Sequence, residues 1–497
     1  MSTADLQNLW HYGWPLIILT GTGFLALVSS VIAGHHRLKI TGAVAALGLL
    51  AALLGYAWVA YPWMNSAASV QVAFLSFDFF GFLLSALVSL IGLLAVLLSY
   101  RYWRAQSEHI PEVFALIAFA VLGMALMVST THLLTFVLGL EVMSLSLYIL
   151  VALRRHDLGS SEASFKYFLL GSVATAFLLF GLSLFYGASG VLDLRLVTVD
   201  SIVGMETVFK LGAILILLAF AFKVAAVPLH FWAPDVYEGA PTPITGFMAT
   251  GVKVAAFGAL IRVAQVFNAF DFIPLSKLFL GLSLATMLVG SFTGLRQKSI
   301  KRIMAYSSIA HAGYLLLGLA SMVQEKTVTP ELLSPLVFYL ITYSMLTLGA
   351  FAVLTALSSG GEEINQLDQF AGFGDKHPVY SAILSLFLLS LAGLPPTAGF
   401  FAKYYLFSQA IRLGLYPFAI VGIIASAISL YYYLAPIVMM YFKTKEKPLS
   451  LPAMGWIFKV IVAAMVIGVF YLGLFPGRLI QVVKGTQLEV SKANQAD

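Results

Sequence analysis

The chain has 497 residues, of which 60% are hydrophobic and 10% charged, and it contains no cysteine. Soluble domains carry about 25% charged residues, so this composition excludes a water-soluble fold and indicates lipid as the solvent. The missing cysteines exclude disulfides, thiolate-held metal clusters and cysteine nucleophiles. The net charge of +6 is explained by Lys and Arg on cytoplasmic loops, so no nucleic-acid partner is expected.

Fourteen segments are apolar over roughly the 20 residues that a spanning helix needs. We expect an all-α polytopic membrane protein of about 14 transmembrane helices, with no room for a soluble domain. Residues 1–14 lack Lys and Arg, and no cleavage site follows the first apolar run, so the first helix should be retained. The expected spans are about 15–33, 40–60, 79–99, 111–129, 132–153, 164–188, 209–228, 242–264, 274–295, 302–322, 332–358, 379–411, 415–441 and 454–475.

Positive charge alternates between the loops. The rich loops should be cytoplasmic, and an even number of spans then places both termini on the opposite side. Loops 61–78 and 129–131 have no Lys or Arg, and 189–208 has only Arg195. The rich loops contain Arg37 and Lys39; Arg101 and Arg104; Arg154 and Arg155; Arg296, Lys298, Lys301 and Arg302; and Lys443, Lys445 and Lys447.

Five ionisable residues lie in the middle of apolar spans rather than near their ends, namely Glu141, Lys223, Lys253, His311 and Lys403. Charge at the bilayer centre costs at least ~2.5–3.5 kcal/mol, so each marks a functional position by default. Desolvation lets a buried lysine lose its proton near neutral pH, and a nearby carboxylate opposes that. With a histidine, whose usual pKa is ~6.5, these residues predict a path for protons.

Structural roles are open for the same residues. Glu141 and Lys223 would form an ion pair between helices, which does not exclude function. His311 would equally form a hydrogen bond between helices. Snorkelling to the interface explains Lys253 and Lys403 poorly, because both lie several turns from the expected helix ends.

Two spans contain helix breakers beside these lysines. Pro228 follows Lys223 and precedes His230, and Pro395 and Pro396 precede Lys403. Proline removes a backbone hydrogen bond, and irregular backbone survives at membrane depth only where protein or a water-filled cavity satisfies it. Secondary candidates for the site are His230, Asp235 and Glu238, which lie in or just after the first break.

The two broken spans are the seventh and the twelfth, five apart, so helices 4–8 and 9–13 form two units with a break at corresponding places. Five-helix units must insert with opposite orientation, which predicts inverted repeats and an ion site near the midplane. The expected divisions are 1–105 (three N-terminal helices), 106–268 and 269–442 (the two repeats), and 443–497 (a C-terminal helix and tail).

The block HFWAPDVYEGAPTP at 230–243 resembles the antiporter-like membrane subunits of respiratory complex I, and most of all the subunit N branch, the counterpart of mitochondrial subunit 2. The similarity extends from about 75 to 440. Further matching stretches are LEVMSLSLYIL at 140–150, EASFKYFLLG at 162–171, KRIMAYSSIAHAGY at 301–314 and LAGLPPTAGFFAKYYLF at 391–407.

The resemblance implies a proton-translocating subunit of a bacterial inner-membrane NADH:quinone oxidoreductase. Glu141 matches the family's fifth-helix carboxylate, and Lys223, Lys253 and Lys403 match its lysines of helices 7, 8 and 12. The partners implied are lipid, protons and other membrane-arm subunits, with quinone involved indirectly. NADH, FMN, iron–sulfur clusters and quinone are expected in partner subunits, and no cofactor or metal in this chain.

The same features fit other classes of membrane protein. Subunits of multi-subunit sodium/proton antiporters share the broken helices and the charged pair, although PDVYEGAPTP and Lys253 argue against them. Relatives of complex I fed by ferredoxin or linked to hydrogenase leave the electron donor open, and a scaffolding bundle is the third possibility.

The polar stretch 359–378, with Glu362 and Glu363, would dock a soluble arm or, as we expect, form a solvated loop. The tail after about 476 should be a surface helix or disordered.

Overall fold

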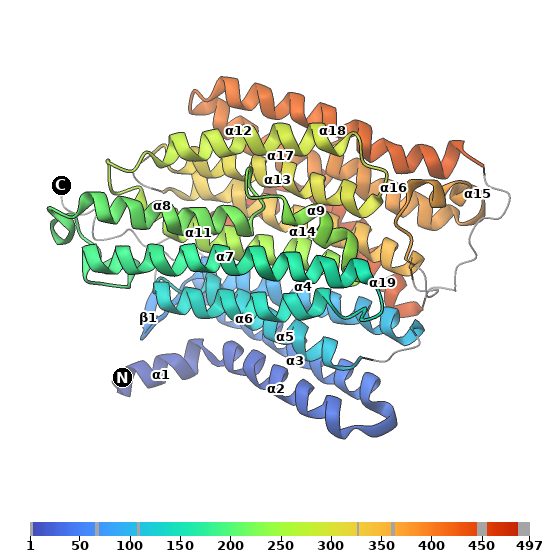
Figure 1. Ribbon diagram of the computed structural model, residues 1–497, viewed down its shortest axis with the longest axis horizontal. Coiled ribbons are helices and arrows are strands. Elements are labelled where there is room, and N and C mark those ends of the chain that lie inside the picture. The colour runs from blue at the N-terminus through green and yellow to red at the C-terminus, as the bar shows by residue number, and fades with distance from the viewer. Residues whose placement is uncertain are drawn as a thin grey trace.

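The computed structural model describes residues 3–64, 69–106, 110–325, 328–358, 363–444 and 455–485. Its helices run side by side along one axis (Figure 1). The α-helices are α1 (Thr3–Tyr12), α2 (Trp14–Ile32), α3 (Arg37–Ala60), α4 (Phe79–Ala105), α5 (Glu112–Val128), α6 (Leu133–Val151), α7 (Leu158–Ser189), α8 (Glu206–Lys223), α9 (Trp232–Gly239), α10 (Thr242–Phe247), α11 (Lys253–Phe267), α12 (Leu275–Gly294), α13 (Ile300–Met322), α14 (Pro330–Leu357), α15 (Phe373–Lys376), α16 (Pro378–Ala392), α17 (Ala398–Arg412), α18 (Tyr416–Phe442), α19 (Trp456–Leu474) and α20 (Pro476–Lys484).

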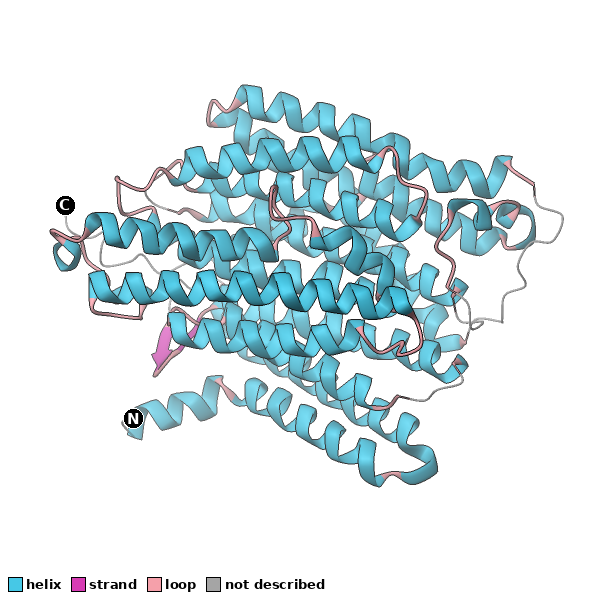
Figure 2. Ribbon diagram, in the orientation of Figure 1, coloured by secondary structure: helices cyan, strands magenta, loops and turns pink. Residues whose placement is uncertain are grey.

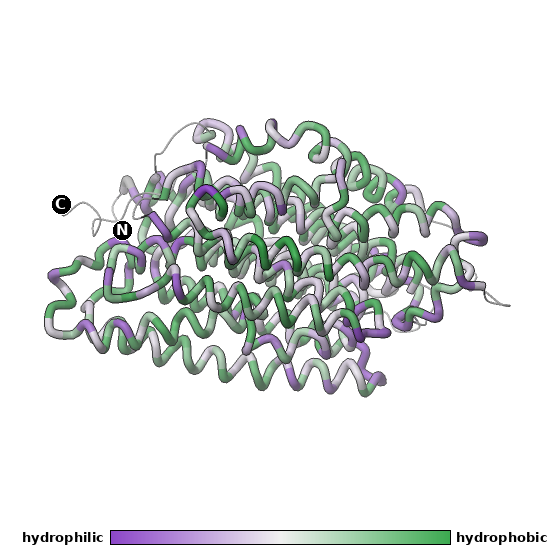
Figure 3. Tube along the Cα trace, turned by 90° about the horizontal axis from the view of Figure 1, so that it is seen from above, coloured by the Kyte–Doolittle hydropathy of each residue, from purple (hydrophilic) through white to green (hydrophobic). Residues whose placement is uncertain are grey.

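The expected helical spans are confirmed. Each of the fourteen coincides with a helix or, for the seventh and twelfth, with an interrupted one. In the described part, 11 helices are long and apolar enough to cross a membrane, and α5 and α16 are shorter apolar helices. Hydrophobic residues lie along the length of the helices, and hydrophilic residues gather toward the two ends of the bundle (Figure 3).

Three spans form the centre of the bundle. The continuous helix α10–α11 and the helices α13 and α14 are almost entirely buried, whereas α2, α7 and α19 leave most of their residues at the periphery. The peripheral faces are apolar: Val31 on α2 is 77% exposed and Phe165 on α7 is 64% exposed. In lipid, such faces need no polar cover, so the central helices are those on which buried polar residues can be kept from lipid.

The short elements lie at the two ends. The strands β1 (Val70–Val72) and β2 (Leu75–Phe77) form an antiparallel hairpin with Val70 opposite Phe77, at the same end as α1 (Figure 1). The last described residue, Gly485, lies against the main chain of Met64, which belongs to the connection before this hairpin. Both ends of the described chain therefore lie at one end of the bundle, as an even number of spans requires.

Both predicted helix breaks are present (Figure 2). The helix α8 ends at Lys223 and is followed by turns up to Trp232, and α16 ends at Ala392, five residues before Thr397, the residue just before α17. The peptide bonds before Pro228 and Pro396 are cis. The division into two inverted repeats, and the segment boundaries drawn from it, stay predictions.

The stretch 359–378 differs from the solvated loop that we expected. Glu362 lies outside the described residues, but Glu363 is buried, with a side chain only 5% exposed. A 3-10 turn at Leu367–Phe370 and the short helix α15 follow it. Lys445 and Lys447, which contributed to the charge bias, also lie outside the described residues. The expected surface helix in the tail is α20, as far as the described residues extend.

Candidate functional site

Glu141 and Lys223 lie on neighbouring helices but do not form the direct ion pair that the sequence suggested. The Lys223 ammonium donates to the Ser144 hydroxyl at 2.8 Å, and the Glu141 carboxylate accepts from Thr175 at 2.7 Å. Ser144 lies one helical turn after Glu141 on α6. Both charged residues are described, and no hydrogen bond or ion pair joins them. A hydroxyl therefore stands where a carboxylate was expected.

Aromatic rings surround the Lys223 ammonium. Its Nζ lies 5.6 Å from the ring centre of Tyr148 and 5.7 Å from that of Tyr167, distances at which a ring face attracts a cation. Tyr167 stacks on Trp232 at 4.7 Å, and Trp232 donates to the Phe222 carbonyl. The Trp232 side chain therefore ties the start of α9 to the end of α8 across the break.

Lys253 is held by the next central helix. Its Nζ donates to the hydroxyl of Ser308 on α13 at 2.8 Å and also to the Ser308 carbonyl. The ring centre of Tyr343 lies 4.8 Å away. Tyr343 and Tyr237 each contact the same Ser308 hydroxyl, at 3.0 and 3.2 Å. Ser308 is thus shared by one lysine and two tyrosines from three other helices.

The backbone changes immediately before Lys253. Residues Met248–Val252 form a π-helical segment between α10 and α11. Such segments are rare, leave the normal backbone ladder and occur frequently at functional sites. Lys253 is the first residue after this segment.

His311 lies one turn after Ser308 on α13 and is hydrogen-bonded through both ring nitrogens. Nδ1 lies 2.6 Å from the Tyr339 hydroxyl, and Nε2 lies 3.1 Å from the Tyr433 hydroxyl. Tyr433 is also hydrogen-bonded to Ser307. The helix–helix hydrogen bond considered for His311 is present, and it places the ring between two hydroxyls that can each donate and accept a hydrogen bond.

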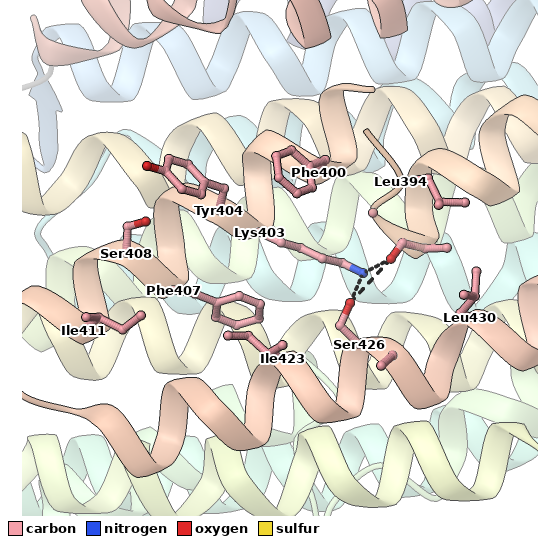
Figure 4. A pocket seen from close by; sticks show the side chains of 13 residues that line it. Leu394, Phe400, Lys403, Tyr404, Phe407, Ser408, Ile411, Ile423, Ser426 and Leu430 are labelled. Carbon is pink, nitrogen blue, oxygen red and sulfur yellow. Dashed lines mark hydrogen bonds between the residues drawn. The ribbon is translucent and has the colours of Figure 1, made fainter. Parts of the chain in front are cut away.

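Lys403 lies after the second break, on α17. Its Nζ donates to the Ala392 carbonyl at the end of α16 and to the Ser426 hydroxyl of α18, at 2.8 and 2.7 Å. Figure 4 shows the side chain reaching toward Ser426 along a cavity. The cavity has a volume of about 470 Å³ and is otherwise lined mainly by apolar side chains. The Tyr314 ring lies 5.5 Å from Nζ.

Four of these residues are basic and buried, and we call Lys223, Lys253, His311 and Lys403 the Lys–His row. Each is buried, and each lies on a different helix, namely α8, α11, α13 and α17. Their polar contacts in the described chain are hydroxyls, carbonyls and ring faces, with no carboxylate among them. Such neutral groups accept hydrogen bonds from a lysine without cancelling its charge. The lysine can therefore gain or lose a proton without the breaking of an ion pair.

The secondary candidates lie elsewhere. His230 is buried in the first break, and no hydrogen bond or ion pair connects it with the row among the described residues. Asp235 lies 2.9 Å from Arg302 and 2.7 Å from Lys166. Glu238 lies 2.9 Å from Arg302. The two carboxylates therefore belong to a partly exposed ionic network along α9, while Tyr237 between them reaches Ser308.

Two buried ion pairs escaped the sequence analysis. Arg262 on α11 contacts Asp78 through two hydrogen bonds of 2.7 Å and also donates to the Val128 carbonyl. Glu363 pairs with Lys301. Each pair joins residues far apart in the chain and near the ends of apolar runs, so no local pattern reveals it. Among the described residues, no group of three His, Asp or Glu side chains could hold a metal ion.

Comparisons with known proteins find relatives along most of the chain. A family model described as NADH:quinone oxidoreductase/Mrp antiporter, TM, matches residues 130–429. The chain is 41% identical to NADH-quinone oxidoreductase subunit N of Trichlorobacter lovleyi, over 87% of this chain and 88% of the relative. It is 37% identical to that of Rhodospirillum rubrum, over 92% and 93%.

Solved structures share the fold. A chain of respiratory complex I from Thermus thermophilus is 33% identical, with a TM-score of 0.79 over 95% of this chain and 100% of that one. A chain of the Mrp complex from a Dietzia species has a TM-score of 0.82 at 21% identity, over 97% of each chain. At that identity, the second similarity concerns the fold alone.

Proposed function

Since the chain belongs to the subunit N family of NADH:quinone oxidoreductase, we propose that Glu141 and the Lys–His row are the path by which this membrane subunit translocates protons. The observation that carries the proposal is the placement of three buried lysines on three helices, each bonded only to neutral groups. A buried charge without a counter-charge is costly, and loss of the proton removes that cost.

The contacts suggest an order of transfer. Lys223 takes up a proton from the cytoplasmic side, and Glu141, across Ser144 and Thr175, adjusts how firmly Lys223 holds it. Lys253 and His311 relay the proton, since Ser308 and the tyrosines around it lie between them. Lys403 releases it, because its side chain adjoins the cavity beside α17.

The gap between Lys223 and Lys253 is bridged by aromatic residues rather than by a direct contact. Tyr167, Trp232 and Tyr237 follow one another from Lys223 to Ser308. The Tyr167 hydroxyl is buried and has no hydrogen-bond partner in the described protein. Buried polar groups are normally satisfied by protein or by ordered water, so this hydroxyl is the point where we expect water to carry the proton across.

The driving energy comes from other subunits of the same enzyme. In the proposal, NADH, FMN, iron–sulfur clusters and quinone belong to those subunits, and this chain supplies only proton-carrying side chains. The other membrane-arm subunits are its neighbours in the bacterial inner membrane. Both termini lie on the non-cytoplasmic side, as the loop charges indicate. The antiporter alternative is supported by a similarity of fold at 21% identity and by a family model whose description covers both classes of protein.

The test measures proton pumping and electron transfer together, in vesicles that contain the whole enzyme with Lys223→Ala in this chain. We expect pumping per electron to fall. Lys210→Ala is the matched control, because Lys210 lies on the same helix nearer its start and is partly exposed.

The outcomes separate three situations. Loss of both activities places Lys223 in an obligatory coupled path, and loss of pumping alone makes this subunit one of several partly independent channels. Normal pumping and electron transfer in both Lys223→Ala and a Glu141→Ala, Lys223→Ala double variant would show that the pair is structural and would sink the path.

A further inference from the structure

Glu363 is a buried carboxylate that the proposed path does not use. It pairs with Lys301 and accepts a hydrogen bond from the Tyr102 hydroxyl at 2.8 Å. Arg154 lies 3.5 Å from the same carboxylate. We call Glu363, Lys301, Arg154 and Tyr102 the Glu363 cluster. Its members come from α4, from the α6–α7 connection, from α13 and from the segment after α14, so it joins both halves of the bundle.

The backbone fixes Glu363 in this place. Ile300 donates to the Asn365 carbonyl at 2.7 Å, and Leu367 donates to the Lys298 carbonyl at 2.9 Å. These bonds attach the segment after Glu363 to the start of α13, where Lys301 lies. The carboxylate is therefore held beside its lysine by main-chain bonds as well as by charge.

The cluster holds the junction between α9 and α10. Glu363 accepts a hydrogen bond from the Thr242 main-chain N–H at 3.0 Å, and Thr242 is the first residue of α10. From the other side, Lys301 donates to the Ala240 carbonyl at 2.8 Å, and Arg154 lies 3.5 Å from the Gly239 carbonyl. The end of one helix and the start of the next are thus bound to one ionic centre.

The helix that begins at Thr242 is the one that carries Lys253. It runs to Phe267 and is wholly buried. Nearer its other end, Arg262 is fixed by the pair with Asp78. The π-helical segment lies between these two anchors. A carboxylate at the first turn also suits the partial positive charge of a helix N-terminus.

The charges of the cluster oppose a role as a proton carrier. Burial raises the pKa of the Glu363 carboxyl, but Lys301 and Arg154 outweigh it, and the pKa lies below the usual value of a glutamic acid. Arg154 has a second partner in Asp157. The two cations, Lys301 and Arg154, balance the two carboxylates, Glu363 and Asp157, so no added proton is needed for neutrality.

We propose that Glu363 is a positioning residue that fixes the start of the helix Thr242–Phe267 and so places Lys253 against Ser308. The inference rests on the proton path proposed above. In that path Glu363 itself carries no proton; its oxygen atoms matter as acceptors for the Thr242 N–H and the Tyr102 hydroxyl.

The test compares two double variants in the whole enzyme, with pumping per electron measured for each assembled complex. Glu363→Gln with Lys301→Met keeps an oxygen acceptor for Thr242 and leaves the net charge unchanged. Glu363→Ala with Lys301→Met has the same charge but no acceptor. Glu162→Gln is the control, since this carboxylate is 66% exposed in an ion pair with Lys166.

We expect near-normal pumping per electron in the glutamine variant and the control, and a several-fold loss in the alanine variant. In a Lys253→Ala background, the alanine variant should cause no further loss, because coupled residues are not additive. Thr242→Pro removes the same hydrogen bond from the donor side at a position where proline is tolerated, and it should reproduce the loss.

Three results would overturn the inference. An equal loss in both double variants would show that pumping depends on the charges of Glu363 and Lys301 and not on the oxygen acceptor for Thr242. Normal pumping per assembled complex in the alanine variant and in Thr242→Pro would reduce the cluster to a structural support. Additive losses with Lys253→Ala would show that Glu363 acts elsewhere. The proposed path fails separately, if Lys253→Ala alone leaves pumping unchanged.

Discussion

The Lys–His row and the Glu363 cluster bury the same kind of side chain in opposite surroundings. In the row, the ammonium groups of Lys223, Lys253 and Lys403 contact hydroxyls, carbonyls and ring faces. In the cluster, Lys301 contacts a carboxylate. Both places are almost free of solvent, so the difference lies in the partners and not in the degree of burial.

The difference teaches how one protein keeps some charges fixed and others exchangeable. Removing one partner of a buried ion pair leaves an uncompensated charge, so paired groups are locked in their charged forms. A lysine whose partners are neutral acceptors can keep its hydrogen bonds whether its amine is protonated or neutral. The paired groups therefore suit anchoring, and the unpaired ones suit proton transfer.

The largest effect is expected when one partner of a buried ion pair is removed. Asp78→Ala leaves Arg262 buried without a counter-charge and should lower the free energy of unfolding by about 3–5 kcal/mol. Asp78 also caps α4 by accepting from the Gly81 N–H at 2.7 Å. Thermal denaturation of the purified complex measures the change.

A second variant separates charge from capping. Asp78→Ala combined with Arg262→Met removes both charges, and we expect most of the stability to return. If Asp78→Ala alone were as stable as the unaltered protein, the buried pairs would not be anchors, and the contrast with the row would lose its basis.

The next largest effect is expected when one lysine of the Lys–His row is given a carboxylate partner. Ser308→Asp places a carboxylate where Lys253 now meets a hydroxyl. The new pair should hold the proton on Lys253 and lower pumping about tenfold, which corresponds to about 1.4 kcal/mol, with the complex still assembled. Pumping per electron in vesicles measures it.

Ser308→Thr keeps a hydroxyl at the same place and serves as the control, with pumping close to normal. Full pumping in Ser308→Asp would mean that Lys253 does not need to release its proton. The relay through α13 would then have to be abandoned.

A smaller effect concerns the pH range in which the Glu363 cluster stays ionised. The pKa of Glu363 lies below its usual value because the charges of Lys301 and Arg154 outweigh burial. A lowered pKa adds stability above the unfolded value, about 4.3 for a glutamic acid, and that stability is lost as pH falls through the folded pKa.

Infrared difference spectra should therefore show no protonated carboxyl band from Glu363 until the pH falls below about 4. The band is assigned by its absence in Glu363→Gln with Lys301→Met. A Glu363 band already present near neutral pH would place this group among the exchangeable ones.

The sequence predicted the row better than the cluster, for physical reasons. A charge inside an apolar run is visible by itself, so Glu141, Lys223, Lys253, His311 and Lys403 could be named as proton-path candidates, a role that stays a prediction. Proline and glycine beside Lys223 and Lys403 likewise revealed both breaks. These signals are local, and each needs only a short window of sequence.

The contacts between helices were not predictable in this way. Glu141 and Lys223 have opposite charges, which suggested a direct pair. In the structure Ser144, one turn after Glu141 on α6, faces the lysine instead. Glu363 lies in a polar stretch that looks solvated. Its burial depends on Lys301 and Tyr102, which are distant in sequence and adjacent only after folding.

The smallest expected effect lies in the backbone beside Lys223. Ala225 adopts a left-handed conformation with φ of +57°, which costs an L-residue roughly 1–2 kcal/mol. Ala225→Gly relieves that strain, but glycine also gives the unfolded chain more freedom, worth about 0.4–1 kcal/mol. The net gain in stability should therefore lie between about 0 and 1.6 kcal/mol, measured as a small rise in the thermal midpoint. Lys223 keeps its neutral partner in this variant, so pumping per electron should not change. A loss of pumping with unchanged stability would mean that the strained turn itself takes part in proton uptake, and the row would then depend on its backbone as well as on its partners.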